Sequence, residues 1–150
     1  MDGAVNMPAD FLGFDHVDTR VRSVRAVEAF YDRLMAELGL PEKRLAHVDE
    51  RGEWHDPSGA KPYNTVEYYE RAKPGKVSCF IGFIEDAQMV PTSTRIAFRV
   101  SSSALDQWHS LLASIGAANI EWSASAEYPA LFFEDPAGTK LELVARRSKA

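Results

Sequence analysis

The sequence predicts an α+β fold of two paired βαβββ modules. Their strands form a curved mixed, mostly antiparallel sheet, with helices on its convex face and a cleft on its concave face. A strand–helix–three-strand order covers the first half and begins again at about residue 92, and the two strand–helix units align at an offset of 79 residues that pairs His16 with Arg95. Because neither half could bury its own helix and sheet face, we expect one domain over residues 1–150, with module one at about 14–86 and module two at about 92–147.

Module one is predicted from two periodicities. Residues 14–21 alternate between apolar and polar side chains, which indicates a half-buried strand. Ser23 is a candidate N-cap for the helix that follows, and Gly39 is a candidate left-handed C-cap. Turn-forming stretches then separate three predicted strands, at 44–49, 64–70 and 77–85. The first dozen residues show no period and are predicted to form an arm.

Module two repeats this order. Residues 95–100 alternate, Ser102 or Ser103 is a candidate N-cap, and an apolar stripe ends at Gly116. Three strands are predicted at 119–123, 130–134 and 139–145, with an Asp-Pro-Ala-Gly turn before the last.

The alternation places ionisable side chains on the face opposite the helices. His16, Arg95 and Glu142 fall on this face of three central strands, at comparable depths. Ionisable groups in a packed domain are costly unless they are paired, hydrated or bound to a metal. The three residues therefore define a candidate site in the cleft.

Composition limits the class of function. The chain has 45% hydrophobic and 26% charged residues and a net charge of −5, which is typical of a globular protein and offers no basic surface for nucleic acid. No apolar run is long enough to span a membrane, and the first residues do not resemble a signal peptide. The single cysteine, Cys79, excludes an internal disulfide and is compatible with a cytoplasmic location.

Several segments resemble the glyoxalase/bleomycin resistance/dioxygenase superfamily, also called vicinal oxygen chelate proteins. This resemblance implies a divalent metal (Zn, Ni, Mn, Mg or Fe) in the cleft, with His16 and Glu142 as metal ligands and catalytic residues. It also implies a lyase, isomerase or dioxygenase-like enzyme that acts on a small molecule. The segments that carry it are FDHVDTRV, AFYDRLMAELGL, RIAFRV and the ending FFEDPAGTKLELV.

Arg95 departs from the pattern of this family, because it stands where a second metal ligand is expected. A guanidinium is always charged and offers only donors, so it repels a metal ion. The metal site is therefore atypical or absent, and a metal-free protein is equally compatible with the sequence. Arg95 could instead pair with Glu142 beside His16, or bind an anionic substrate. Cys79 is only loosely placed as a further ligand, and Ser78, Phe80 and Ile81 are equally reachable.

Aromatic residues of module one are candidates for substrate binding. Trp54, Tyr69 and Phe80 could line a pocket for a flat ligand, although aromatic residues in such strands are often ordinary core. His55 could also reach the cleft. The alternative to an enzyme is a metal-free binding protein of the bleomycin-resistance type. Both hypotheses expect a homodimer, packed side by side or exchanging modules through the linker at 86–92.

Overall fold

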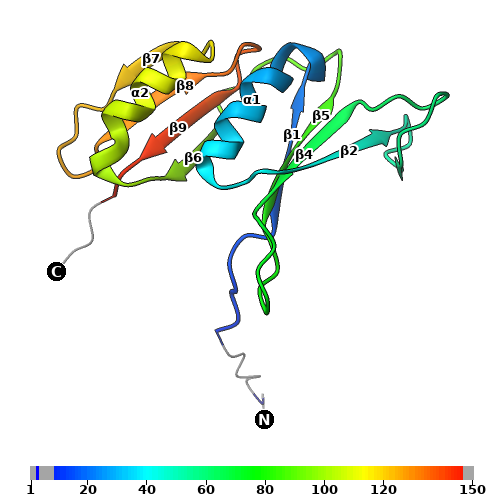
Figure 1. The fold of residues 1–150 in the computed structure, drawn as a ribbon, viewed down its shortest axis with the longest axis horizontal. Coiled ribbons are helices and arrows are strands. Elements are labelled where there is room, and N and C mark those ends of the chain that lie inside the picture. Colours follow the sequence, from blue (N-terminus) through cyan, green and yellow to red (C-terminus); the bar gives the residue numbers. More distant parts are fainter. Residues whose placement is uncertain (1–2, 4–8, 147–150) are drawn as a thin grey trace.

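The computed structural model describes residue 3 and residues 9–146, and it contains two successive modules (Figure 1). The predicted α+β fold class with βαβββ modules is confirmed. The end of module two at residue 147 and the start of the arm, residues 1–2 and 4–8, lie outside the described residues. Module one contains β1 (His16–Val21), α1 (Val24–Leu38), β2 (Glu42–Val48), β3 (Trp54–His55), β4 (Thr65–Tyr69) and β5 (Phe80–Glu85). Module two contains β6 (Arg95–Arg99), a short 3₁₀ helix η1 (Ser102–Ala104), α2 (Leu105–Ser114), β7 (Ala118–Trp122), β8 (Ala130–Glu134) and β9 (Lys140–Val144).

Each module forms its own mixed sheet. The strand orders are β1-β5-β4-β2-β3 and β6-β9-β8-β7, and in both sheets the first strand pairs in parallel with the last strand of its module. The other pairings are antiparallel. Strands β1 and β6 are edge strands, so no ladder of hydrogen bonds joins the two sheets within the described residues. No helix in the described part of the chain is long and apolar enough to cross a membrane.

The ends of α1 follow the sequence prediction, whereas the start of α2 does not. The Ser23 side chain accepts a hydrogen bond from the Ala26 N–H, and Gly39 adopts the left-handed conformation with φ of 90°. The predicted cap at Ser102 or Ser103 is wrong, because both residues belong to η1 and α2 begins after Ala104 without a side-chain cap. Asp106 in the first turn of α2 offers its negative charge to the helix dipole instead.

Helix α1 connects the two modules through their shared core. Tyr31 stacks on Phe83 of module one with ring centroids 3.7 Å apart, and its hydroxyl donates a 2.5 Å hydrogen bond to Asp135 in the turn between β8 and β9. Asp135 is 1% exposed and also accepts from the backbone N–H groups of Ala137 and Thr139. Burial, and secondarily Asp135, raises the pKa of Tyr31, so the phenol is a neutral donor.

The helix-facing side chains of both sheets belong to this one core. Val66 and Phe83 of module one lie in the same buried cluster as Leu131 and Leu141 of module two. The concave face of each sheet, which we define as the face turned away from its helix, therefore points away from the shared core.

We predict that the contact between Tyr31 and Asp135 stabilises the placement of the two modules. Tyr31→Phe should lower the free energy of unfolding by about 1–3 kcal/mol, because the buried Asp135 carboxylate loses a donor. Denaturant unfolding measures this change. Tyr63→Phe is the matched control, since Tyr63 donates to Glu28 at a less buried position and its loss should have a smaller effect. Equal effects of the two variants would contradict the prediction.

Candidate functional site

A row of stacked rings crosses the concave face of module one. The register aligns His16 on β1 with Phe80 on β5, and Phe80 with Tyr69 on β4. The rings of His16 and Phe80 are stacked with centroids 4.6 Å apart, and those of Phe80 and Tyr69 with centroids 4.3 Å apart. The guanidinium of Arg44 lies 5.1 Å from the centroid of Tyr69 at the far end of the row. The row of rings therefore offers a flat apolar surface next to charged groups.

Two carboxyl groups meet in the next row, over Gly82. Asp18 and Glu67 flank this glycine in the register, and a Cβ atom at Gly82 would lie 2.7 Å from Asp18 Oδ1 and 3.6 Å from Glu67 Cγ. Glu67 is only 6% exposed. Burial raises the pKa of Glu67, and Asp18 raises it further, whereas Tyr69 and Arg44 oppose the shift. The missing side chain of Gly82 makes room for both carboxyl groups.

His16 is directed at carboxylates through both ring nitrogens. Its Nδ1 lies 2.7 Å from Asp15 Oδ2, and its Nε2 lies 3.6 Å from Asp18 Oδ2. The side chain is 42% exposed. The hydrogen bond to Asp15 is the largest contribution that raises the pKa of His16, so the imidazolium form is favoured. This environment suits a proton donor.

We predict that Gly82→Ala displaces the Asp18 carboxylate, because no side-chain carbon fits within 2.7 Å of Oδ1. The expected cost is about 1–3 kcal/mol in the free energy of unfolding, as for other overpacked sites. Amide chemical shifts along β1 should change as well. Gly59→Ala is the control, because nothing lies within 4 Å of the Cβ position at Gly59. Similar behaviour of the two variants would show that Gly82 is not a spacing residue.

The concave face of module two presents cations on an aromatic platform. The Arg95 guanidinium lies 4.6 Å from the ring centroid of Phe132, and Lys140 Nζ lies 3.6 Å from Glu134 Oε1. Glu142 is half-buried and aligned between Ala97 and Phe132. The side chains that line the hollow of about 240 Å³ on this face are Arg95, Asn119, Glu121, Phe132, Phe133, Glu134 and Lys140.

The structure distributes the predicted site residues over both concave faces. His16, Tyr69 and Phe80 share one face, and Arg95 and Glu142 share the other, with no hydrogen bond or ion pair between the two sets among the described residues. The alternative ion pair between Arg95 and Glu142 is wrong, because the guanidinium is stacked on Phe132 instead. Trp54 lies on β3, at the opposite edge of the sheet from β1.

Sequence reasoning missed Glu67 and Phe132 as residues of these faces. Both lie in the middle of predicted strands, where the alternation with buried neighbours assigns them to the concave face. The glycine in the middle of β5 was a further signal, since glycine inside a strand often marks a close approach of neighbouring groups.

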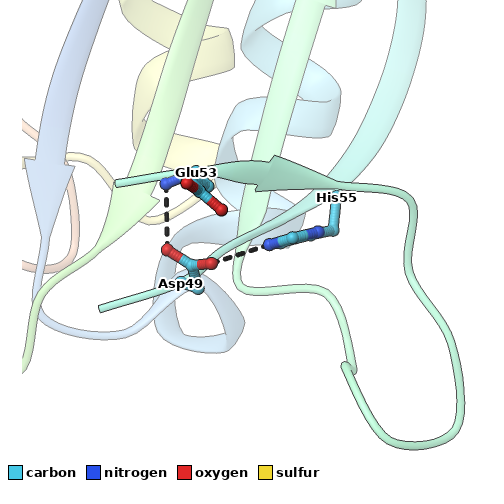
Figure 2. A group of neighbouring side chains, drawn as sticks. All are labelled: Asp49, Glu53 and His55. Atoms are coloured by element: carbon cyan, nitrogen blue, oxygen red, sulfur yellow. Dashed lines mark hydrogen bonds and ion pairs between the residues drawn. The ribbon is translucent and has the colours of Figure 1, made fainter. Parts of the chain in front are cut away.

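The hairpin of β2 and β3 holds a group of side chains with the spacing of metal ligands (Figure 2). One ligand atom from each of Asp49, Glu53 and His55 lies within 4.8 Å of the others. Asp49 Oδ1 accepts from the backbone N–H groups of Arg51 and Glu53, and Oδ2 lies 2.7 Å from His55 Nε2. Lys61 Nζ lies 3.3 Å from the other ring nitrogen of His55, Nδ1. The contacts of Asp49 and His55 are therefore explained by their part in holding the hairpin together.

We predict that His55→Ala raises the pKa of Asp49 from about 2 toward its ordinary value of 3.8, because the hydrogen bond from His55 is the largest cause of the shift. A lowered carboxyl pKa stabilises the folded state above about pH 4, and this contribution is lost as the pH falls toward 2. An NMR titration of the Asp49 carboxyl carbon measures the shift. His47→Ala is the control, since His47 bonds to the Pro62 carbonyl instead. A pKa still near 2 in H55A would assign the shift to the backbone donors.

Solved structures of the glyoxalase/bleomycin resistance/dioxygenase superfamily share this fold. A mutant of FosX, a fosfomycin resistance protein from Listeria monocytogenes complexed with Mn(II) and 1S,2S-dihydroxypropylphosphonic acid, is 17% identical, with a TM-score of 0.55 over 91% of this chain and 93% of that chain. A protein from Bacillus anthracis assigned to the glyoxalase family is 17% identical, with a TM-score of 0.58 over 94% of this chain and 100% of that chain. A glyoxylase/bleomycin resistance protein/dioxygenase domain from Frankia sp. EAN1pec is 19% identical, with a TM-score of 0.55 over 90% of this chain and 98% of that chain.

These likenesses establish the fold at low sequence identity, and the predicted resemblance to this superfamily is confirmed at that level. No protein-family model matches the sequence, and no curated protein matches it.

The residues of the concave faces do not fit the divalent metal that this fold family implies. Arg95 places a permanent cation at the position on β6 where the family's pattern expects a ligand. Both nitrogens of His16 are directed at carboxylates of its own module, and Glu142 belongs to no group of three or more potential ligands among the residues that the structure describes. We therefore derive no chemical step through a metal.

Proposed function

We propose that the protein is a small-molecule enzyme of the vicinal oxygen chelate type in which Arg95 replaces a metal ion. The observation that carries this proposal is the guanidinium of Arg95, which lies over Phe132 on the same hollowed face as Glu142 and has no ion-pair partner within the described residues. An oriented cation beside the substrate stabilises negative charge that develops on a substrate oxygen. We assign the reaction to the lyase or isomerase class, with an enolate-like intermediate.

Glu142 and His16 are the proposed proton-transfer groups. The Glu142 side chain accepts a proton from the carbon α to the carbonyl group, and the charge that moves to the carbonyl oxygen is stabilised by Arg95. His16, which is favoured as an imidazolium by Asp15, returns a proton to the intermediate. Phe80 stacks on His16, and Tyr69 stacks on Phe80; both aromatic residues are proposed to bind the flat part of the substrate. Trp54 stays a prediction as a substrate-binding residue.

We further propose that the cleft is completed by two copies of the chain. His16 and Glu142 lie on different concave faces that both turn away from the shared core. Because β1 and β6 are edge strands with one side free of strand pairing in the described part of the chain, module one of one copy and module two of another can close around a ligand. The protein would then be a homodimer, and the free thiol of Cys79 is compatible with a cytoplasmic location.

The second candidate function is a metal-free binding protein. The stacked row of His16, Phe80 and Tyr69 favours it, since a ring platform binds a flat ligand without any proton transfer. The two functions differ in what the loss of Glu142 does, because a binder needs no base.

We predict that the protein exchanges the α-proton of enolisable hydroxy-carbonyl compounds for deuterium in D2O, as measured by NMR. Glu142→Gln and His16→Asn should each slow the exchange by about 100-fold or more, the usual size of an acid–base contribution. Glu50→Gln and His109→Asn are matched controls outside the concave faces. Mixing the two inactive variants should restore about a quarter of the activity, since a mixed dimer regains one intact cleft of two.

Three outcomes would contradict parts of this proposal. Absence of exchange together with ligand binding that E142Q leaves unchanged would favour the binding protein. Stoichiometric divalent metal in the purified protein, lost in both H16A and E142A, would show that a metal does the work assigned to Arg95. Failure of the mixed variants to complement each other would place the cleft within one chain.

A further inference from the structure

Two cations occupy neighbouring positions in the cleft-forming face of module two. Arg95 and Lys140 are register partners on the parallel strands β6 and β9, so their side chains leave the sheet side by side. They lie on the concave face, because the next residue of β9, Leu141, is fully buried in the shared core. Both line the same hollow of about 240 Å³.

Each cation is held by a different neighbour. The Arg95 guanidinium crosses toward β8 and lies over Phe132, with 4.6 Å between Cζ and the ring centroid. Lys140 is held by Glu134, whose other carboxylate oxygen accepts from Asn119 Nδ2. The ring orients the guanidinium without using any of its N–H groups, so these donors stay available to a ligand.

The charges of this row do not cancel. Glu134 balances Lys140, whereas Arg95 makes no ion pair or hydrogen bond to a carboxylate within the described part of the chain. Glu121 lines the hollow on edge strand β7, and Glu142 lies in the next row, between Ala97 and Phe132. The charge that no ion pair balances among the described residues is thus that of the Arg95 guanidinium, a planar donor beside the second cation, Lys140.

We propose that Arg95 and Lys140 form a two-cation site for an oxyanion of the ligand, either a carboxylate or a phosphorus oxyanion. The guanidinium offers two parallel N–H donors to one side of the anion, and the ammonium binds the other side. Phe132 is the platform that positions Arg95, and Glu134 with Asn119 positions Lys140. This inference deepens the proposed function and rests on it only for the assignment of this face to the ligand cleft.

The site also gives the substrate an orientation. A ligand anchored by its oxyanion at Arg95 and Lys140 presents its adjacent atoms to Glu142, which lies two residues along β9 from Lys140. The substrate class is therefore a small acid whose reacting carbon is close to the anionic group. A neutral ligand would gain nothing from the charge of the guanidinium, whereas an oxyanion forms charge-assisted hydrogen bonds with it.

The test is an NMR titration of the full chain with acetate, methylphosphonate and inorganic phosphate, each compared with chloride at equal ionic strength. Saturable shifts are expected at the Arg95 Nε–H and along β6 and β9. Arg95→Met and Lys140→Met should each weaken binding by about tenfold, the size expected for one charge-assisted contact. Phe132→Leu should weaken it less. Acetate and the two phosphorus compounds differ in shape, so their relative affinities distinguish the two oxyanions.

Matched variants separate this site from general charge effects. Arg33→Met removes an exposed cation from α1, and Lys76→Met breaks an equivalent lysine–glutamate pair, Lys76 with Glu70, in module one. Both should bind the probes as the unmodified protein does. Equal weakening by the controls, or no saturable binding of any probe, would overturn the proposal. Binding that depends on Arg95 and Lys140 in a protein without α-proton exchange would keep the anion site and reject the enzyme.

Discussion

The buried hydrogen bond from Tyr31 to Asp135 is the contact on which the arrangement of the two modules depends. Tyr31 belongs to α1 of module one, and Asp135 belongs to the turn that starts β9 of module two. Asp135 is 1% exposed, and its second oxygen holds the backbone of the same turn. The Asp135 side chain therefore shapes the β8–β9 turn and also attaches this turn to α1. This attachment aligns β9 and Glu142 relative to module one.

Because the two modules share one core, their polar side chains lie on the faces turned away from it. When one helix packs against the inner faces of two sheets, both outer faces are released for polar groups. The polar rows of this protein lie on those faces: Asp18 and Glu67 over Gly82 in one sheet, and Arg95 with Lys140 in the other. Edge strands β1 and β6, each paired on one side only within the described residues, lie beside these rows. The same packing that stabilises the chain thus turns the polar rows of both sheets away from the core.

Period-two patterns predicted the fold class and the face of each strand residue, because alternation along a strand depends only on local backbone geometry. Ser23 and Gly39 were predictable for the same reason. The positions of His16 and Glu142 relative to each other could not be predicted, since they depend on how α1 packs between two sheets. The start of α2 was missed because Ser102 and Ser103 prefer to cap or turn, and here they form the 3₁₀ turn itself. Alternation could place Glu67 on the concave face, but its position beside Asp18 over Gly82 depends on the pairing of three strands.

Under the proposed function, Arg95 in place of a metal ligand changes how a substrate oxygen is held. A metal ion attracts substrate oxygens and can exchange its ligands, whereas a guanidinium attracts the same oxygens only through donors fixed in a plane. The stacking on Phe132 compensates in part, because an oriented donor loses little conformational freedom when it binds. Lys140 lies beside Arg95, but its charge is balanced by Glu134. Under the proposed function, the electrostatic part of metal chemistry therefore rests mainly on the oriented guanidinium, while proton transfer is left to carboxyl and imidazole groups.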